Sequence, residues 1–313
     1  MSDREDNPGP DQSTDNPILG MAAALAAFFL FTVMNVCAKL LADEHSVIEI
    51  TFWRNLVALL PFLAIALLAP RRGIHRIQAK PGLVILRSVL GALSLMVTFG
   101  AFSLMPMADT TVLMFTSSLF IPLLGILFLK ESVGPWRWGA AVVGFLGVAI
   151  MTRPGSSGPA SLPLLGVALA LLASLMHATL QIILRYLGSY EKPLTVTFYF
   201  FLVGTMVAAL PMPWVGRWPS LESLPLLLGV GLSGLGAQFC LTIAFKNAQA
   251  AIVTVFNYSG IVWATLFGWM IWDEWPLPVV IAGATVVIAS NAVMIWRESR
   301  VRNLQGDRVR ARL

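Results

Sequence analysis

A membrane-length apolar segment occurs twice in this sequence, and the duplication limits the folds open to the chain. Residues 101–131 read AFSLMPMADTTVLMFTSSLFIPLLGILFLKE, and residues 244–274 read AFKNAQAAIVTVFNYSGIVWATLFGWMIWDE. The two stretches align without a gap, and each closes on a glutamate, Glu131 or Glu274. Apolar identities arise easily by chance, so the paired glutamates are the stronger sign that a membrane segment was duplicated.

The composition places most of the chain in a lipid bilayer. Hydrophobic residues make up 57% of the 313 residues and charged residues only 12%, whereas a soluble domain has about 25% charged residues. A spanning helix needs about 20 mostly apolar residues and satisfies its own backbone hydrogen bonds. The alternating pattern of barrel strands is absent from the sequence. We therefore predict an all-α membrane protein.

Ten apolar segments, each bounded by charge, proline or glycine, are predicted to be transmembrane helices. They lie near residues 18–40, 48–69, 80–101, 108–129, 136–152, 163–184, 194–213, 223–245, 250–272 and 277–297. Residues 153–162 form the most linker-like stretch between them. We expect a disordered tail over 1–17, five-helix repeats over 18–152 and 163–297, and a basic tail over 298–313.

The distribution of lysine and arginine predicts the orientation. With the N-terminus in the cytoplasm, sixteen cationic residues fall on the cytoplasmic side and four on the outer side. Cytoplasmic loops carry the excess of lysine and arginine in membrane proteins. Both termini are therefore expected in the cytoplasm, and the net charge of +5 is explained by topology without a nucleic-acid partner.

An odd number of helices in each repeat means that the second repeat crosses the membrane in the opposite sense. A second alignment supports the duplication, because Asn35 and Lys39 match Gln181 and Arg185 at a constant offset. Inverted repeats allow a central site to face either side of the membrane in turn. This architecture predicts a transporter.

At this point the chain resembles the EamA branch of the drug/metabolite transporter superfamily. The resemblance rests on the ten segments in two halves, on the closing motifs LFLKE and MIWDE, on NVCAK at residues 35–39, and on ITFWRN around Arg54. It implies a carrier of small polar metabolites of the amino-acid, nucleoside-derivative or vitamin type. It also implies that Glu131 and Glu274 are the hallmark carboxylates of the family, and the bacterial plasma membrane is the expected location.

Polar side chains inside spans are costly and indicate a site. Amides in a helix bundle either join helices or line a cavity, and a buried histidine is either simply hydrogen-bonded or suited to proton coupling. We expect a substrate cavity between the repeats, formed by Asn35, Arg54, His177, Gln181, Asn257, Tyr258 and Trp263.

Further charged residues have competing interpretations. Lys39, Arg87 and Arg185 are candidates for charge or gating roles, although Lys39 and Arg185 lie at span ends where long side chains reach the interface. Arg54 could instead pair with Glu49 or Asp109. Glu131 and Glu274 each precede a proline that begins another helix, so we expect them to accept free N–H groups of a helix start.

The span-embedded cations outnumber the nearby acids, which favours a substrate with a carboxylate or phosphate. The sequence contains no catalytic arrangement, metal-ligand cluster or phosphate-binding loop, so we expect no enzyme activity, metal or cofactor. A membrane-embedded lipid enzyme and a structural subunit are the alternatives. The expected partners are a small-molecule substrate and the lipid bilayer, and the sequence leaves open whether the chain forms a homodimer.

Overall fold

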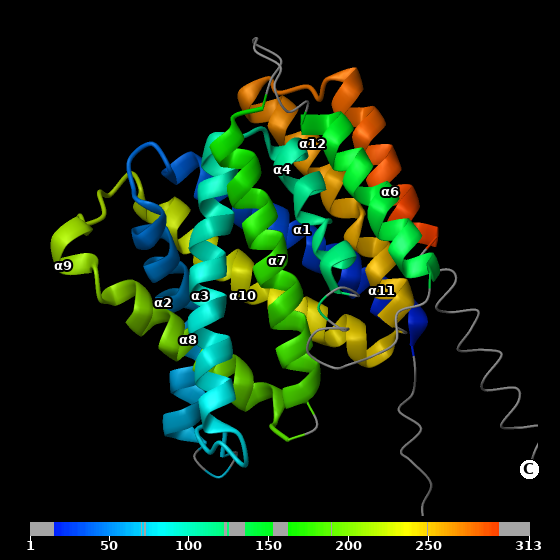
Figure 1. The fold of residues 1–313 in the computed structure, drawn as a ribbon. Coiled ribbons are helices and arrows are strands. Elements are labelled where there is room, and N and C mark those ends of the chain that lie inside the picture. The colour runs from blue at the N-terminus through cyan, green and yellow to red at the C-terminus, as the bar shows by residue number, and fades with distance from the viewer. Residues whose placement is uncertain are drawn as a thin grey trace, which may run out of the picture.

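The protein is helical throughout the part of the chain that its computed structural model describes, namely residues 16–69, 71, 73–121, 124, 135–152, 162–188, 190–248 and 250–293 (Figure 1). No strand occurs among these residues, and the predicted all-α class is confirmed. Glu131, residues 298–313, and most of the predicted linker and N-terminal tail lie outside the described residues.

The helices follow the apolar segments of the sequence. The first half of the chain contributes α1 (Pro17–Leu41), α2 (Val47–Leu68), α3 (Pro81–Leu104), α4 (Met107–Met114) and α6 (Pro135–Thr152). The second half contributes α7 (Leu164–Leu187), α8 (Pro193–Ala209), the short α9 (Met212–Val215), α10 (Leu224–Asn247), α11 (Ala250–Asn257), α12 (Ser259–Trp272) and a last helix over Pro278–Val293.

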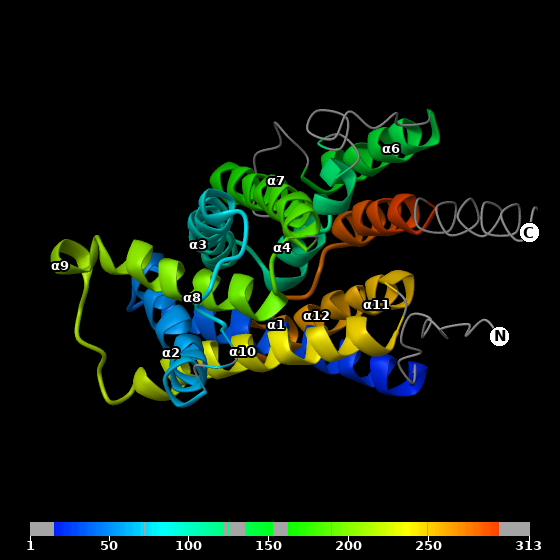
Figure 2. The same cartoon turned by 90° about the horizontal axis from the view of Figure 1, so that it is seen from below.

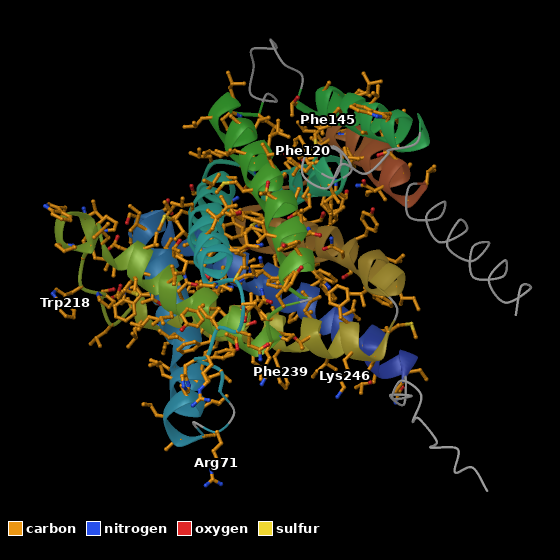
Figure 3. All side chains as sticks on the ribbon, turned by 60° about the horizontal axis from the view of Figure 1, so that its bottom comes forward. Arg71, Phe120, Phe145, Trp218, Phe239 and Lys246 are labelled. Carbon is orange, nitrogen blue, oxygen red and sulfur yellow. The ribbon has the colours of Figure 1, made fainter. Side chains whose placement is uncertain are left out.

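Five of the described helices, α1, α2, α3, α7 and α10, are long and apolar enough to cross a membrane. Shorter apolar helices cover Met107–Ile121, Trp138–Thr152, Pro193–Ala209 and Pro278–Val293. The bundle also exposes large apolar side chains, such as Phe239 at 67% and Trp218 at 94% (Figure 3). A soluble monomer rarely exposes so much apolar surface, so this exterior is suited to lipid.

Two predicted spans are interrupted where continuous helices were expected. The segment near 108–129 turns at Phe115 and Thr116, and the segment near 250–272 turns at Tyr258. In the first break, the hydroxyls of Thr116 and Ser118 donate to the carbonyls of Leu113 and Phe115 at 2.7 and 2.6 Å. Such local bonds compete with helical hydrogen bonds.

The two breaks lie against each other in the bundle. The rings of Phe115 and Tyr258 have centroids 5.1 Å apart. The buried Asn291, in the last helix, reaches the first break: its Nδ2 donates to the Phe115 carbonyl at 3.5 Å, and its Oδ1 lies 2.7 Å from the Ser118 hydroxyl oxygen. Neighbouring polar groups of this kind allow a helix to break inside a membrane.

The helices pack reciprocally between the two halves. The first helix of the first half, α1, packs most extensively on α10, and the first helix of the second half, α7, packs on α3. The pair α2 and α10 is likewise matched by α8 and α3, while α2 packs on α8 and α4 on α12. Figure 2 shows α1 beside α10 and α3 beside α7 as two separate pairs.

Two loop contacts also join the two halves reciprocally. Glu49, in the first turn of α2, caps its own helix with Ser46 and accepts the backbone N–H of Arg217 from the loop before α10. Glu191, between α7 and α8, accepts the backbone N–H groups of residues 78–80 at 2.8, 2.8 and 2.9 Å. Each half therefore holds a loop of the other half through one carboxylate.

Small residues let α6 approach the last helix closely. A Cβ added at Gly147 would lie 2.9 Å from the Gly283 carbonyl, and one added at Gly283 would lie 2.6 Å from the Gly147 carbonyl. These two helices lie side by side in Figure 1. Neither glycine lines the cavity described next.

Candidate functional site

A cavity of about 440 Å³ lies between the two halves of the bundle. This volume is within the 300–1,000 Å³ that is typical of small-molecule pockets. Both halves contribute to the wall, which consists of Phe28, Phe31, Thr32, Met34, Asn35, Arg54, Arg87, Gly91, Leu95, Thr98, Phe102, Thr111, Met114, Phe115, Ser117, His177, Leu180, Gln181, Leu184, Thr197, Phe200, Gln238, Leu241, Asn257 and Gly260. No aspartate or glutamate is among these described residues.

The structure brings five of the seven predicted site residues to this one wall. They are Asn35 on α1, Arg54 on α2, His177 and Gln181 on α7, and Asn257 at the end of α11. The Oδ1 atom of Asn35 is buried and has no hydrogen-bond partner among the described residues. An uncompensated buried polar atom is costly, so this amide is available to an occupant of the cavity.

Two arginines share one aromatic ring at the cavity wall. The guanidinium carbon of Arg54 lies 5.4 Å from the ring centroid of Phe200, and that of Arg87 lies 4.8 Å from the same centroid. Phe200 is also the residue that aligns with Arg54 in the duplicated sequence. Arg87, which we treated as a gating candidate, is therefore a neighbour of Arg54 in the cavity wall.

Arg54 makes no ion pair with Glu49 or Asp109 in the described structure. Its Nη1 donates to the neutral Oδ1 of Asn55 at 2.9 Å. Both carboxylate oxygens of Glu49 accept backbone N–H groups, at Ser46 and Arg217. Arg54 is 1% exposed, and its Nε has no partner among the described residues. The internal pair considered from the sequence is therefore not formed.

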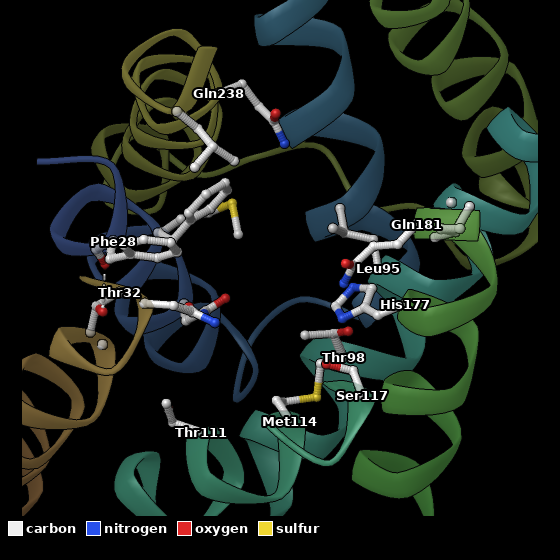
Figure 4. Close-up of a pocket in the computed structure, with 18 of the residues that line it drawn as sticks. Phe28, Thr32, Leu95, Thr98, Thr111, Met114, Ser117, His177, Gln181 and Gln238 are labelled. Carbon is white, nitrogen blue, oxygen red and sulfur yellow. Dashed lines mark hydrogen bonds between the residues drawn. The ribbon is translucent and has the colours of Figure 1, made fainter. Parts of the chain in front are cut away.

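His177 and Gln181 enter the cavity one helical turn apart on α7. Figure 4 shows the two side chains beside each other, with Thr98 of α3 and Ser117 close to the histidine. Phe28 and Thr32 of α1 lie across the cavity from them. Residues four apart lie on the same face of a helix, which explains why one helix presents both polar groups to the same space.

Two predicted site residues, Tyr258 and Trp263, are not part of the wall. The ring of Tyr258 packs on Phe115 at the helix break, and Trp263 makes an edge contact with Phe29, with centroids 5.1 Å apart. Both side chains therefore contact other aromatic rings and not the cavity. The Arg185 side chain lies outside the described part of the structure.

Sequence reasoning missed Gln238, Thr98 and Ser117, which also line the cavity. Gln238 is an amide inside the apolar α10, so the signal that selected Gln181 was present there too. Thr98 gave no comparable signal, because a hydroxyl can bond to its own helix, and it does so with the Ser94 carbonyl at 2.8 Å.

A second polar cluster lies at the predicted outer ends of the helices. The Nζ of Lys39, in the last turn of α1, donates to Glu274 Oε1 at 2.6 Å and to the Met105 carbonyl at 3.0 Å. It also lies 4.7 Å from the ring centroid of Trp272. The other oxygen of Glu274 accepts the backbone N–H of Met107, the first residue of α4, at 3.1 Å. We call this group the outer ion pair.

Glu274 accepts an N–H group at the start of a helix, as expected. That helix is α4 in the other half, however, and not the helix that follows Pro276. The turn after α12 explains the difference: Asp273 adopts a left-handed conformation with φ 55°, and the N–H of Glu274 donates to the Gly268 carbonyl at 3.0 Å. This helix-ending turn directs Glu274 back toward α1.

No group of three or more metal-ligating side chains occurs among the described residues. The apolar helices, and the cavity between the two halves, define a multi-pass integral membrane protein with room for a small molecule. The chain belongs to the EamA-like transporter family, because the sequence model of that family matches residues 18–153 and again residues 164–296. The family resemblance is confirmed, and the chain is a transporter-family protein and not an enzyme.

Individual relatives support the same family. The chain is 31% identical to the pseudopaline exporter CntI of Pseudomonas aeruginosa strain UCBPP-PA14, over 87% of this chain and 94% of the exporter. It is 29% identical to the riboflavin transporter of Rhizobium johnstonii, over 90% and 93% of the two chains. One solved crystal structure has a similar fold, with a TM-score of 0.58 and 19% identity over 88% of this chain and 98% of the other.

Proposed function

We propose that this chain is a secondary transporter that moves a small polar metabolite across a cytoplasmic membrane by alternating access. The observation that best supports this proposal is the cavity, because both halves of the bundle contribute to its wall. The names of the relatives, a pseudopaline exporter and a riboflavin transporter, support a metabolite as the substrate. Amino-acid, nucleoside-derivative and vitamin types are the classes to test first.

The transport cycle would use two inverted five-helix repeats, over residues 18–152 and 163–297. The reciprocal packing of α1 on α10 and of α7 on α3 supports this arrangement, as do the helix breaks at matched positions and the double match to the family model. A rocking motion between such repeats exposes a central site to one side and then to the other.

The described conformation would be the inward-facing one. The cavity wall includes Leu184 and Leu241, near the ends of α7 and α10 that we expect in the cytoplasm. At the opposite end, the outer ion pair joins α1, the start of α4 and the end of α12. Opening to the outside would require Lys39 and Glu274 to separate.

The proposed substrate-binding side chains are Asn35, Arg54, Arg87, His177, Gln181 and Asn257. Each lines the cavity, and each is a polar group inside an apolar segment. Tyr258 and Trp263 are assigned to packing around the helix break. Lys39 has a gating role in this proposal.

The chain would lie in a bacterial inner membrane with both termini in the cytoplasm. Cysteine labelling tests this in a background where Cys37 and Cys240 are serine. Ser220→Cys, in the exposed loop before α10, should react with an impermeant maleimide on intact cells. Arg76→Cys, in the loop before α3, should react only after the membrane is opened. The reverse pattern would contradict the orientation.

Counterflow in proteoliposomes tests transport itself. Vesicles loaded with an unlabelled metabolite should take up the labelled form, recovered without chemical change, for at least one of a panel of amino acids, nucleosides and riboflavin. Ser117→Trp should block this uptake because it fills the cavity. Val142→Trp is the matched control, since Val142 is 56% exposed on α6, away from the wall. Equal uptake by both variants would contradict the cavity as the pathway.

A further inference from the structure

The cavity wall carries fixed positive charge that the described residues do not neutralise. Arg54 and Arg87 both line it, and none of its described residues is acidic. The ion pairs found in the described structure join Lys39 to Glu274 and His45 to Glu49, and they involve neither arginine. A charge in a low-dielectric site interacts strongly with any counter-charge that enters.

Several guanidinium N–H groups also lack hydrogen-bond partners. In the described structure these are Nε of Arg54 and both Nε and Nη1 of Arg87, all buried. A guanidinium group has five donors arranged to match a carboxylate or a phosphate in two parallel bonds. Among the described residues, Arg54 directs only one hydrogen bond to a side chain, the neutral Asn55 amide.

The aromatic contact holds the two arginines in place without replacing a counter-ion. A cation over a ring is stabilised by much less than the cost of removing an ion from water. Phe200 shares its ring between both guanidinium groups, so it compensates for only part of that cost. The remainder favours a ligand with a negative charge.

The rest of the wall has a different character. Hydrogen-bonding groups come from Asn35, His177 and Gln181, and Phe28 provides an aromatic face. The start of α12 also meets the cavity at Gly260, and the positive end of a helix dipole favours an anion. A ligand that fits would carry its anionic group at one end and a neutral, partly aromatic body.

We infer that the substrate is an organic anion whose carboxylate or phosphate is bound jointly by Arg54 and Arg87, with the uncharged part against Phe28, His177 and Gln181. The inference rests on the proposed transport function and specifies its substrate class. The two arginines act as specificity residues, and a neutral analogue of the same shape leaves their N–H groups without partners.

Ligand-induced thermal stabilisation of the purified protein tests this, because a ligand that binds the folded state raises the unfolding temperature. The probes are two matched pairs at millimolar concentration: nicotinate against nicotinamide, and riboflavin 5′-phosphate against riboflavin. We expect at least one acid to stabilise the wild type and its neutral partner to have a much smaller effect. Which pair responds distinguishes a carboxylate from a phosphate.

Variants assign the effect to the two arginines. Arg54→Gln and Arg87→Gln should each weaken the apparent affinity for the acid at least about tenfold, since hydrogen bonds to charged groups are the stronger ones. Arg76→Gln, on the exposed loop before α3, should leave it unchanged. Equal stabilisation by acid and neutral partner, an undiminished shift in the Gln variants, or no shift with either acid would overturn the inference.

The counterflow assay separates this inference from the transport function. Uptake of a neutral or cationic metabolite that Arg54→Gln leaves unchanged would overturn the anionic substrate class and leave transport standing. Acid binding that depends on both arginines, in a protein that moves none of the panel, would support the anion site and count against transport.

Discussion

The molecule contains two groups of membrane-embedded cations that differ in their hydrogen-bond and ion-pair partners. Lys39 has a carboxylate at 2.6 Å, a carbonyl at 3.0 Å and an indole ring beneath it. Arg54 and Arg87 have aromatic rings and, for Arg54, one neutral amide. The first group is satisfied within the protein, whereas the second retains unpartnered donors among the described residues.

This difference indicates that the charge of Lys39 stabilises the fold, whereas the charges of Arg54 and Arg87 are available to a ligand. A paired cation contributes to the stability of the fold, and removing it leaves the partner carboxylate unpaired. A cation without a partner lowers the stability of the empty protein, and proteins accept that cost mainly where function requires it. The two groups should therefore respond to substitution with different signs.

The largest effect is expected at Lys39. Lys39→Met leaves Glu274 without its cation, and we expect the free energy of unfolding to fall by about 2–4 kcal/mol. This loss is somewhat smaller than that for breaking a fully buried pair, because both side chains are partly exposed. Reversible unfolding in mixed micelles measures it. A double-mutant cycle with Glu274→Gln isolates the pair, and additive losses would show that the two side chains do not interact.

Close helix contact gives the next largest effect, far from either cation. Gly147→Leu forces α6 away from Gly283, and overpacking of this kind costs about 1–3 kcal/mol. Gly139→Leu on the same helix is the control, because a Cβ there meets nothing within 4 Å. Ligand-induced stabilisation should persist in both variants. Equal stability of the two would show that the glycine contact is not needed.

Arg54 should show the opposite sign from Lys39. Arg54→Gln removes an uncompensated charge, so the stability of the ligand-free protein should increase, by up to about 1 kcal/mol. The same unfolding assay applies, with Arg54 and Lys39 variants measured side by side. A loss as large as that of Lys39→Met would mean that Arg54 is structural, and the contrast between the two groups would fail.

The smallest effect is a pH dependence at Glu191, outside the membrane-spanning helices. Burial alone would raise the pKa of this carboxyl, but the backbone N–H groups of residues 78–80 lower it below its ordinary value of 4.5. A lowered folded-state pKa gives stabilisation that is present at neutral pH and is lost as the pH falls below 4.5 and through the folded value.

Glu191→Gln should remove that part of the acid sensitivity. Unfolding midpoints between pH 7 and pH 3 measure it, and Glu222→Gln, in an exposed position before α10, is the control. Identical pH profiles for the wild type and Glu191→Gln would show that this carboxylate does not hold the loop through its charge.

Much of the fold could be predicted because lipid imposes simple rules on sequence. Apolar length located the helices, and the duplicated segments pointed to two related halves. The same cost of burying polar groups selected Asn35, Arg54, His177, Gln181 and Asn257, which the structure places on one cavity wall. Their role in binding stays a prediction.

Other features depend on side-chain direction, which periodicity does not supply at a helix break. Tyr258 sits at such a break and packs on Phe115, a contact that its depth in the membrane did not predict. The partner of Glu274 was equally hidden, because a left-handed turn at Asp273 decides where the carboxylate points. Thr98 was missed since its hydroxyl bonds to its own helix.

The outer ion pair also constrains how the protein is made. Lys39 and Glu274 are separated by 235 positions in the chain. At a synthesis rate of about 5–20 residues per second, roughly 10 to 50 s pass between the two. During that interval the hydrogen bond between Lys39 and Glu274 cannot form. The contact that joins α1 to the end of α12 is therefore made only after nearly the whole chain has been synthesised.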